Sequence, residues 1–340
     1  MKIGDFDTDQ RVLVIAEIGN NHEGDFNLAK ELIGLAAEAG ANAVKFQSIV
    51  PERLVSPNDL ARIEQLQKFR LEEKDFRALR EEAERLGIIF LSTPFDLDVV
   101  DFLDELVPAF KIASSDNNFF PLIDKVASKG KPLLISLGLG RIAHAQDLER
   151  YLDDYWRNLG MDNPGICFMH CVCAYPTPIE EAGLMQLDRL KALNSTPGYS
   201  DHTLGIKACE IAVARGARVV EKHFTKDKNQ SSFRDHQLSA DQEDFKSLVD
   251  AVRTVEEYLG PDTQMPRPSE KKNLSLVRRA PTAIKDIQVG EDLTSENLAW
   301  LRGTSGELGQ RVHDLSSSIL GAKVRRKKIK GETIAPEDLI

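Results

Sequence analysis

The sequence predicts an α/β protein built on a (β/α)8 barrel, with a small second domain after it. Eight short apolar runs recur between residues 12 and 224, and a helical pattern follows each run. Parallel strands need such crossover helices, because a tight turn cannot join them. A doubly wound open sheet is the alternative fold. The count of eight favours the barrel, and no G-x-G-x-x-G motif follows the first run to indicate a dinucleotide-binding sheet.

The apolar runs are the expected strands, and the amphipathic segments between them are the expected helices. Several helical segments end in glycine, which is common at helix C-termini. The long segment 49–74 separates the second strand from its helix, and we expect it to lie at the rim or beside a substrate. The expected strands are 12–19, 43–48, 88–94, 109–114, 132–138, 166–171, 196–201 and 218–224. The expected helices are 27–40, 75–87, 97–106, 121–130, 145–160, 184–193, 206–216 and 241–260.

The composition of the chain divides it into a large and a small part. We expect residues 1–260 to form the barrel, the Pro-rich and polar segment 261–278 to be a linker, and residues 279–340 to form a second domain. The second part contains a weak internal repeat, residues 289–298 against 330–339. So short a segment buries little apolar surface by itself, so we expect it to pack on the barrel or on another chain.

Length, charge and cysteine usage limit the class of protein. The 340 residues include no signal-peptide pattern and no run of apolar residues long enough to span a membrane. Four cysteines in a chain of this length do not indicate a disulfide framework, so a cytoplasmic location is expected. The net charge of −10 argues against broad nucleic-acid binding. Any anionic substrate must then be bound by a few specifically placed lysines or arginines.

Polar residues stand at the C-terminal ends of the expected strands, where the active sites of such barrels lie. Lys45 and Lys111 lie within otherwise apolar runs, where an unpaired ammonium group costs several kcal/mol. We expect them to bind an anion such as phosphate or carboxylate; a buried salt bridge to Glu17 or Glu221 is the alternative. The polar strand-end residues expected to line this pocket include Glu17, Lys45, Gln47, Thr93, Lys111, Ser114, Ser136 and Ser200.

Two histidines stand at the ends of the seventh and eighth expected strands. If those strands are neighbours, the imidazoles of His202 and His223 lie close enough to bind one divalent ion. Imidazole is a suitable ligand for Mn, Fe, Co or Zn, and two protein nitrogens leave positions for water and substrate oxygens. Two hydrogen-bonded core histidines are the alternative. Asp201 and Glu221 are candidates for further ligands or for acceptors that orient the rings.

Seven motifs occur in an order that resembles the sialic acid synthase family over nearly the whole chain. They are IAEIGNNHEGD, AVKFQS, FLSTPFD, FKIAS, YPTP, YSDHT and EKHFT. The resemblance implies a TIM barrel followed by an antifreeze-like domain. It also implies an enzyme that joins phosphoenolpyruvate to an N-acylated hexose, typically N-acetylmannosamine, and releases phosphate and a nine-carbon keto-sugar acid.

The resemblance implies a role for individual residues. His202 and His223 would bind a catalytic divalent ion, Mn²⁺ first, with Mg²⁺ or Co²⁺ as alternatives. Arg302, in the segment NLAWLRG, would reach the acyl-sugar in the active site of a second copy, which implies a homodimer. The residues that would bind phosphoenolpyruvate are Lys45, Lys111, Thr93, Ser114 and Ser136. The residues that would hold the sugar or move its protons are Glu17, Gln47, Tyr175 and Asp235.

The chain departs from the family pattern at three places. Cys173 stands where many members have asparagine, SLGLG replaces the usual pattern after the fifth strand, and SFRDH replaces a glycine-proline pair before Asp235. The Cys173 departure concerns a phosphate or water contact, and the departures together concern the sugar that is accepted. Synthases for neuraminate, legionaminate, pseudaminate or another surface or spore-coat sugar acid therefore all remain. A metal-dependent pyruvate aldolase and a non-catalytic sugar-binding protein are the alternatives from other classes.

Overall fold

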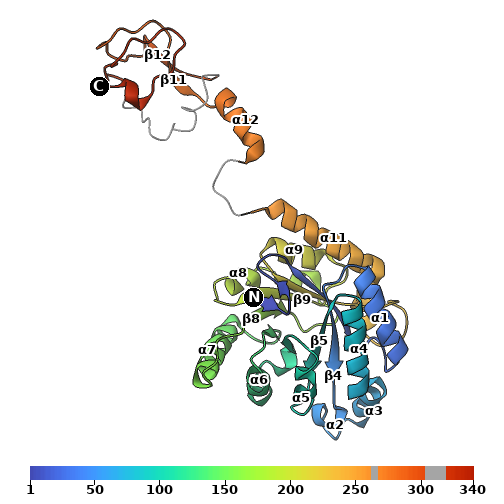
Figure 1. The fold of residues 1–340 in the computed structure, drawn as a ribbon. Coiled ribbons are helices and arrows are strands. Elements are labelled where there is room, and N and C mark those ends of the chain that lie inside the picture. Colours follow the sequence, from blue (N-terminus) through green and yellow to red (C-terminus); the bar gives the residue numbers. More distant parts are fainter. Residues whose placement is uncertain (262–266, 303–318) are drawn as a thin grey trace. The chain divides into compact units, whose positions relative to one another are not determined.

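The structure is a computed structural model that describes residues 1–261, 267–302 and 319–340. The chain divides into two compact units, residues 1–260 and 261–340. In the first unit, helices surround a sheet of parallel strands (Figure 1).

The first unit contains an eight-stranded parallel sheet in the order β5-β4-β3-β10-β9-β8-β7-β6. The two end strands, β5 and β6, also contact each other, so the sheet is nearly closed into a barrel. This confirms the predicted (β/α)8 fold and excludes the open sheet. The strands are β3 (Leu13–Gly19), β4 (Ala43–Ser48), β5 (Ile89–Pro94), β6 (Phe110–Ile112), β7 (Leu133–Ser136), β8 (Ile166–Cys171), β9 (Thr196–Asp201) and β10 (Val219–His223).

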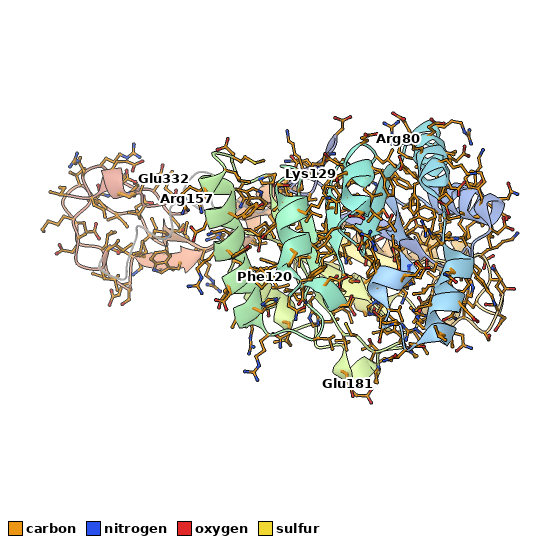
Figure 2. The ribbon with its side chains drawn as sticks, turned by 90° about the horizontal axis from the view of Figure 1, so that it is seen from below. Arg80, Phe120, Lys129, Arg157, Glu181 and Glu332 are labelled. Atoms are coloured by element: carbon orange, nitrogen blue, oxygen red, sulfur yellow. The ribbon has the colours of Figure 1, made fainter. Side chains whose placement is uncertain are left out.

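The helices of the first unit connect successive strands and carry charge on their outer faces. Figure 2 shows Arg80 and Arg157 at the periphery, where they lie 2.7 Å from Glu84 and 2.5 Å from Asp154. The helices are α1 (Phe26–Glu38), α2 (Pro51–Leu54), α3 (Leu60–Phe69), α4 (Glu73–Arg85), α5 (Val99–Asp104), α6 (Phe120–Ala127), α7 (Ile142–Asn158), α8 (Gln186–Leu190), α9 (Lys207–Ala214), α10 (Asp235–Leu238) and α11 (Gln242–Leu259).

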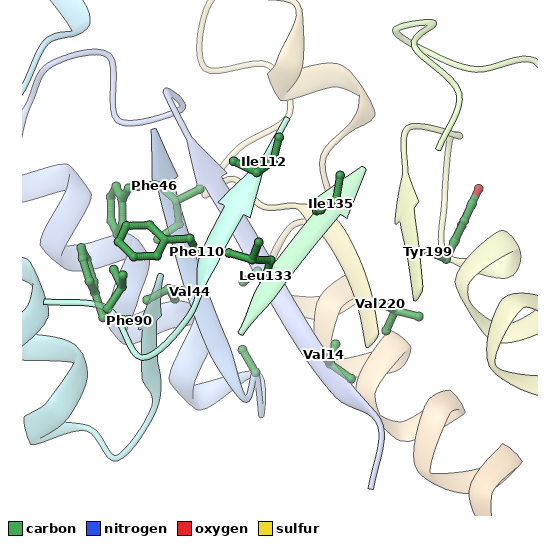
Figure 3. Packing of buried hydrophobic residues seen from close by; sticks show 14 of the residues in the cluster. Val14, Val44, Phe46, Phe90, Phe110, Ile112, Leu133, Ile135, Tyr199 and Val220 are labelled. Atoms are coloured by element: carbon green, nitrogen blue, oxygen red, sulfur yellow. The ribbon is translucent and has the colours of Figure 1, made fainter. Parts of the chain in front are cut away.

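Alternate strand side chains face the helices and form the larger hydrophobic core. Phe46 of β4 stacks on Phe90 of β5 with ring centroids 5.6 Å apart, and it meets Phe76 of α4 edge-on at 6.5 Å. Figure 3 shows the rings of Phe46, Phe90 and Phe110 grouped beside the strands. Each such side chain contributes about 1.5–3 kcal/mol when fully buried. The side chains that face the helices hold the strands in place. The alternate side chains of each strand point inward and fill the barrel.

The inward side chains change from apolar to polar along each strand. On β3 the inward residues Leu13 and Ile15 are followed by Glu17, and on β10 Val219 is followed by Glu221. The lower half of the barrel is therefore a dry core, and the upper half is a polar chamber. The buried residues of the lower core are Ile3, Leu13, Ile15, Ala43, Leu91, Ala109, Leu134, Cys167, Met169 and Val219.

One member of this lower core comes from an N-terminal hairpin that the sequence analysis missed. The strands β1 (Lys2–Ile3) and β2 (Phe6–Asp7) pair in antiparallel fashion. Ile3 is fully buried in the lower core, with Met1 and Phe6 packed against it. Strands of two residues carry too little periodicity to be recognised in a sequence.

We expect Ile3→Ala to lower the free energy of unfolding by about 2–5 kcal/mol, because it leaves a cavity in a closed core. Urea unfolding followed by circular dichroism measures the change. Lys2→Ala is the matched control, since Lys2 is exposed on the same hairpin, and surface changes usually stay within about 0.5 kcal/mol. Equal stabilities for the two variants would show that the hairpin does not close the barrel.

The second unit is small, and part of the expected linker is helical. Helix α12 (Pro268–Val277) lies within the segment 261–278, and the strands β11 (Ala280–Ala283) and β12 (Leu298–Leu301) pair in antiparallel fashion. Its buried core consists of Ala283, Ile287, Leu293, Leu298, Ile319, Val324 and Ile334. Among the described helices of both units, none is long and apolar enough to cross a membrane.

Candidate active site

A cavity of about 380 Å³ lies at the C-terminal ends of the barrel strands. It brings together every predicted site residue of the barrel except Asp201, whereas Arg302 lies in the second unit and is exposed. A larger cavity of about 710 Å³ near the N-terminal hairpin contains none of the predicted residues. The predicted residues that line the smaller cavity are Glu17, Lys45, Gln47, Thr93, Lys111, Ser114, Ser136, Tyr175, Ser200, His202, His223 and Asp235.

The barrel floor of the cavity is a network of buried charges. The Nζ of Lys45 lies 2.8 Å from Oε2 of Glu17 and 3.8 Å from Oε2 of Glu221. The Nζ of Lys111 lies 3.8 Å from Oε1 of Glu221. The lysines therefore have carboxylate partners, as the salt-bridge alternative predicts, and they are not left unpaired inside the protein.

Hydroxyl groups complete the floor. Lys45 donates a hydrogen bond to Oγ1 of Thr93 at 2.8 Å, and Lys111 donates to Oγ of Ser136 at 2.7 Å. Ser200 donates to Oε1 of Glu221 at 2.9 Å. These contacts join residues of six different strands, so they hold the ammonium groups at fixed places below the cavity.

Burial and neighbouring charge set the protonation of these groups. Burial alone would raise the pKa of Glu221, but Lys111 and Lys45 outweigh it and lower the pKa to about 2. For Glu17 burial prevails over Lys45, and with the help of Glu221 it raises the pKa to about 6. Burial also lowers the pKa of Lys111, which Glu221 offsets only in part. Lys111 is thus the less compensated lysine and the better placed one to gain from a bound anion.

The two histidines predicted as metal ligands lie side by side. Their ring centroids are 5.4 Å apart, because β9 and β10 are neighbours in the sheet. Nδ1 of His202 donates to the carbonyl oxygen of Val172 at 2.8 Å, which leaves Nε2 for a ligand. Burial lowers the pKa of His202 to about 4, with a further contribution from His223. Burial and the neighbouring imidazole of His223 therefore favour a neutral ring, the form that binds metals.

The donor set fits a divalent ion held by two imidazoles. Nδ1 of His223 is buried and has no hydrogen-bond partner among the described residues. Within the same residues, no group of three or more His, Cys, Asp or Glu side chains is arranged to hold a metal. The chain therefore offers two nitrogens, and the remaining positions would belong to water or substrate oxygens.

Asp201, a candidate for a further metal ligand or for an acceptor that orients the histidine rings, has a different role in the structure. Its carboxylate accepts hydrogen bonds from Lys222 and from the hydroxyl of Tyr199, each at 2.8 Å, and it does not line the cavity. In a strand, neighbouring side chains point to opposite faces, so Asp201 points to the helices while Ser200 and His202 point into the barrel. The Asp201–Lys222 pair is a buried structural ion pair.

Two of the departures from the family pattern meet at one wall of the cavity. The backbone N–H of Gly138 donates to Oγ of Ser114 at 3.0 Å. A Cβ atom at position 138 would collide with Sγ of Cys173 and lie 2.7 Å from Oγ of Ser114. Glycine in SLGLG thus makes room for the Cys173 thiol beside Ser114.

Two arginines of the cavity were missed by the sequence analysis. Arg62 comes from α3, in the segment expected to lie at the rim, and Arg234 directly precedes α10. The spacing of Leu60, Ile63 and Leu66 is helical and would have predicted α3. Which of its polar residues turns toward the cavity depends on how that helix packs, and this is not visible in the sequence.

Comparison with known proteins agrees with the fold. A model of the NeuB family matches residues 32–264, and a model of the SAF domain matches residues 278–340. The N,N'-diacetyllegionaminic acid synthase of Campylobacter jejuni subsp. jejuni serotype O:2 is 37% identical, over 91% of this chain and 96% of its own length. The N-acetylneuraminate-9-phosphate synthase of Homo sapiens is 34% identical, over 84% of this chain and 81% of its own.

A solved structure extends the similarity to three dimensions. The crystal structure of N-acetylneuraminic acid (sialic acid) synthetase from Leptospira borgpetersenii serovar Hardjo-bovis has a TM-score of 0.74 and 30% identity. The match covers 81% of this chain and 94% of that one. The chain therefore belongs to the NeuB family and carries a SAF domain, the antifreeze-like domain, at residues 278–340.

Proposed function

We propose that the protein is a nonulosonic acid synthase that joins phosphoenolpyruvate to an N-acylated hexose, N-acetylmannosamine or a related sugar. The products are a nine-carbon keto-sugar acid and phosphate, released by cleavage of the carbon–oxygen bond. The observation that carries the proposal is the convergence of two buried lysines and two neutral imidazoles on one cavity. The synthase names of the relatives support the class and leave the neuraminate, legionaminate and pseudaminate sugars as candidates.

The lysines and hydroxyls of the floor bind phosphoenolpyruvate. Lys111 supplies the principal positive charge, because its Nζ lies as far as 3.8 Å from Oε1 of Glu221, its carboxylate partner. Ser114 and Ser136 line the same wall and can donate to phosphate or carboxylate oxygens. Lysine provides a point charge rather than a planar fork, so the arrangement suits either group of this substrate.

His202 and His223 would hold the divalent ion, with Mn²⁺ expected and Mg²⁺ or Co²⁺ as alternatives. When bound, such an ion supplies Lewis acidity to a carbonyl oxygen. Tyr175 packs on His202 with ring centroids 4.1 Å apart, and it thereby keeps that ring in place at the cavity wall.

The reaction forms one carbon–carbon bond. The enol carbon of phosphoenolpyruvate attacks the aldehyde carbon of the open-chain sugar, water adds to the resulting cationic carbon, and phosphate leaves. Glu17 is placed to move a proton, since its pKa of about 6, raised by burial, lies near neutral pH. Gln47 donates to Oε1 of Glu17 at 2.8 Å and orients the carboxyl group. Holding both substrates in one cavity supplies further acceleration.

Phosphate release tests the proposal. With Mn²⁺ and phosphoenolpyruvate, we expect the purified protein to release phosphate only when an N-acylated hexose is added, because attack on the aldehyde precedes loss of phosphate. A panel of such sugars, followed by a colorimetric phosphate assay, makes the measurement. Condensation with pyruvate in place of phosphoenolpyruvate would favour the aldolase. Absence of phosphate release with every sugar of the panel would refute the synthase.

The SAF domain is expected to act on a second copy in a homodimer, with Arg302 reaching the acyl-sugar of the partner. The support is the resemblance of NLAWLRG to the family segment and the small core of the second unit. An equal mixture of Arg302→Ala and Glu17→Ala chains that dimerise at random should then regain about a quarter of the wild-type sites, because about half of the dimers are mixed and each mixed dimer restores one site of two. Activity no greater than that of the parent variants, in dimers verified by native mass spectrometry, would assign Arg302 to its own chain.

A further inference from the structure

We propose that the buried ion pair between Asp201 and Lys222 positions the two candidate metal ligands, by fixing His202 and His223 relative to each other from the helix-facing side of the sheet. The inference rests on the proposed function, because it takes these histidines as the ligands. Each member of the pair directly precedes one of the histidines in the chain. The two members are also register partners on the neighbouring strands β9 and β10.

A single ammonium group bonds the chain on both sides of His202. The Nζ of Lys222 lies 2.8 Å from Oδ2 of Asp201, and the two side chains are 1% and 0% exposed. The same Nζ donates to the carbonyl oxygen of Thr203, the residue that follows His202. Because water does not screen these contacts, they are stronger and more rigid than an ion pair on the surface.

The carboxylate of Asp201 closes the turn that carries His202. Its Oδ1 accepts hydrogen bonds from the hydroxyl of Tyr199 at 2.8 Å and from the backbone N–H of Thr203 at 2.9 Å. The hydroxyl of Thr203 donates to Oδ2 at 3.2 Å. The backbone before and after His202 is therefore fixed by one side chain, and the direction of the imidazole follows from that backbone.

His223 depends on its backbone still more than His202 does. Nδ1 of His202 has the carbonyl oxygen of Val172 as a partner, whereas Nδ1 of His223 has none among the described residues. The carbonyl oxygen of His223 accepts a hydrogen bond from the N–H of Ala240 at 2.8 Å. Lys222 ties the other side of His223 to β9, so the ion pair links the strand ends that carry both rings.

Stability alone gives no reason for a charged pair at this place. Tyr199 and Val220, two residues earlier on the same faces of β9 and β10, belong to the larger hydrophobic core (Figure 3). Well-packed apolar side chains are often as stabilising as a buried ion pair, or more so. What Asp201 and Lys222 add is direction, because charged hydrogen bonds fix the distance and angle between two strands.

Mn²⁺ affinity tests the inference in the full-length protein without substrates. We expect Asp201→Asn to weaken Mn²⁺ binding about tenfold to hundredfold, the usual effect of changing a residue that orients metal ligands. Titration calorimetry measures the affinity, and urea unfolding followed by circular dichroism measures stability. Combining Asp201→Asn with Lys222→Met leaves no buried charge unpaired, so this double variant should fold even if the single variant does not. It should show the same loss of affinity.

Arg253→Met is the matched control, because it removes a largely buried cation at the opposite end of the barrel. Arg253 donates to the carbonyl oxygen of Val12, directly before β3, at 2.9 Å and to Glu256 at 2.7 Å. We expect this variant to unfold at a lower urea concentration than the wild type and to bind Mn²⁺ with unchanged affinity. A purely structural role of the Asp201–Lys222 pair predicts the same behaviour for both sites.

The outcomes separate this inference from the proposed function. Wild-type Mn²⁺ affinity in the folded ion-pair variants, or an equal loss of affinity in Arg253→Met, would overturn the positioning role. The synthase would then still stand on phosphate release by the wild type. A wild-type protein that releases phosphate with an N-acylated hexose but binds no Mn²⁺ would refute the metal ligands, and this inference with them, while the reaction itself would remain.

Discussion

His202→Gln and His223→Gln are each expected to lose about a thousandfold in metal-dependent turnover while remaining folded. Lewis-acid stabilisation is worth several kcal/mol, and the two neighbouring rings are the proposed metal ligands. Glutamine keeps a polar side chain of similar size but lacks the imidazole nitrogen. Phosphate release at saturating Mn²⁺ measures turnover, and titration calorimetry of Mn²⁺ measures binding without turnover.

His170→Gln is the matched control for these variants. His170 also lies at the end of a barrel strand, but its Nε2 bonds the carbonyl oxygen of Ala182 at 2.7 Å and the side chain does not line the cavity. We expect its turnover and Mn²⁺ binding to stay near wild type. If a His202 or His223 variant bound Mn²⁺ as tightly as this control, that histidine would no longer be a candidate ligand.

Glu17→Gln is expected to reduce kcat/KM about a hundredfold to ten-thousandfold, the range of general acid–base catalysis. Burial raises the pKa of Glu17 to about 6. Acting as a base, it must be ionised, so the wild-type kcat/KM should rise with pH through about 6, and this limb should vanish from the residual activity of the variant. A pH profile from 5 to 8 measures it.

A control variant and the pH profile of Glu17→Gln test whether Glu17 is the group that titrates near pH 6. Glu149→Gln is the matched control, because Glu149 is a half-buried residue of α7 whose carboxyl pKa is also raised by burial. This variant should keep the wild-type kcat/KM and its rise with pH. A Glu17→Gln enzyme whose kcat/KM still rises with pH through about 6 would assign the titration to another group.

For stability the pH dependence of Glu17 has the opposite sign to that for activity. A raised carboxyl pKa means that the folded state binds the proton more tightly than the unfolded state, so the contribution of Glu17 to stability is lost as pH rises through about 6.

The strands were predictable because their signal is local. The segments 43–48, 166–171 and 196–201 match β4, β8 and β9 residue for residue. Elsewhere the strand ends differ by a few residues, as at 109–114 against β6 (Phe110–Ile112), because apolar residues continue past the last ladder hydrogen bond. The N-terminal hairpin was missed, since what defines it is the burial of Ile3 against strands far along the chain.

Most members of the site were predictable, although Arg62 and Arg234 were missed, and its contacts were predictable only in part. Chain order places Glu17, Lys45 and Lys111 at strand ends, and a parallel barrel brings such ends together. The partners of the lysines were left open between an anion and a carboxylate, and the structure pairs them with Glu17 and Glu221. Adjacent residues such as Asp201 and His202 differ in role because the strand turns them to opposite faces.

The sequence by itself determined the number and chain order of the barrel strands and the change from apolar to polar at their ends, because hydrophobic periodicity is a property of neighbouring residues. Only the tertiary structure decided which charges compensate one another and which remain available. The ion pairs of Lys45 and Lys111 and the packing of Tyr175 on His202 all depend on contacts between distant segments. Coulomb and hydrogen-bond energies depend on distances in space, which separation along the chain does not set.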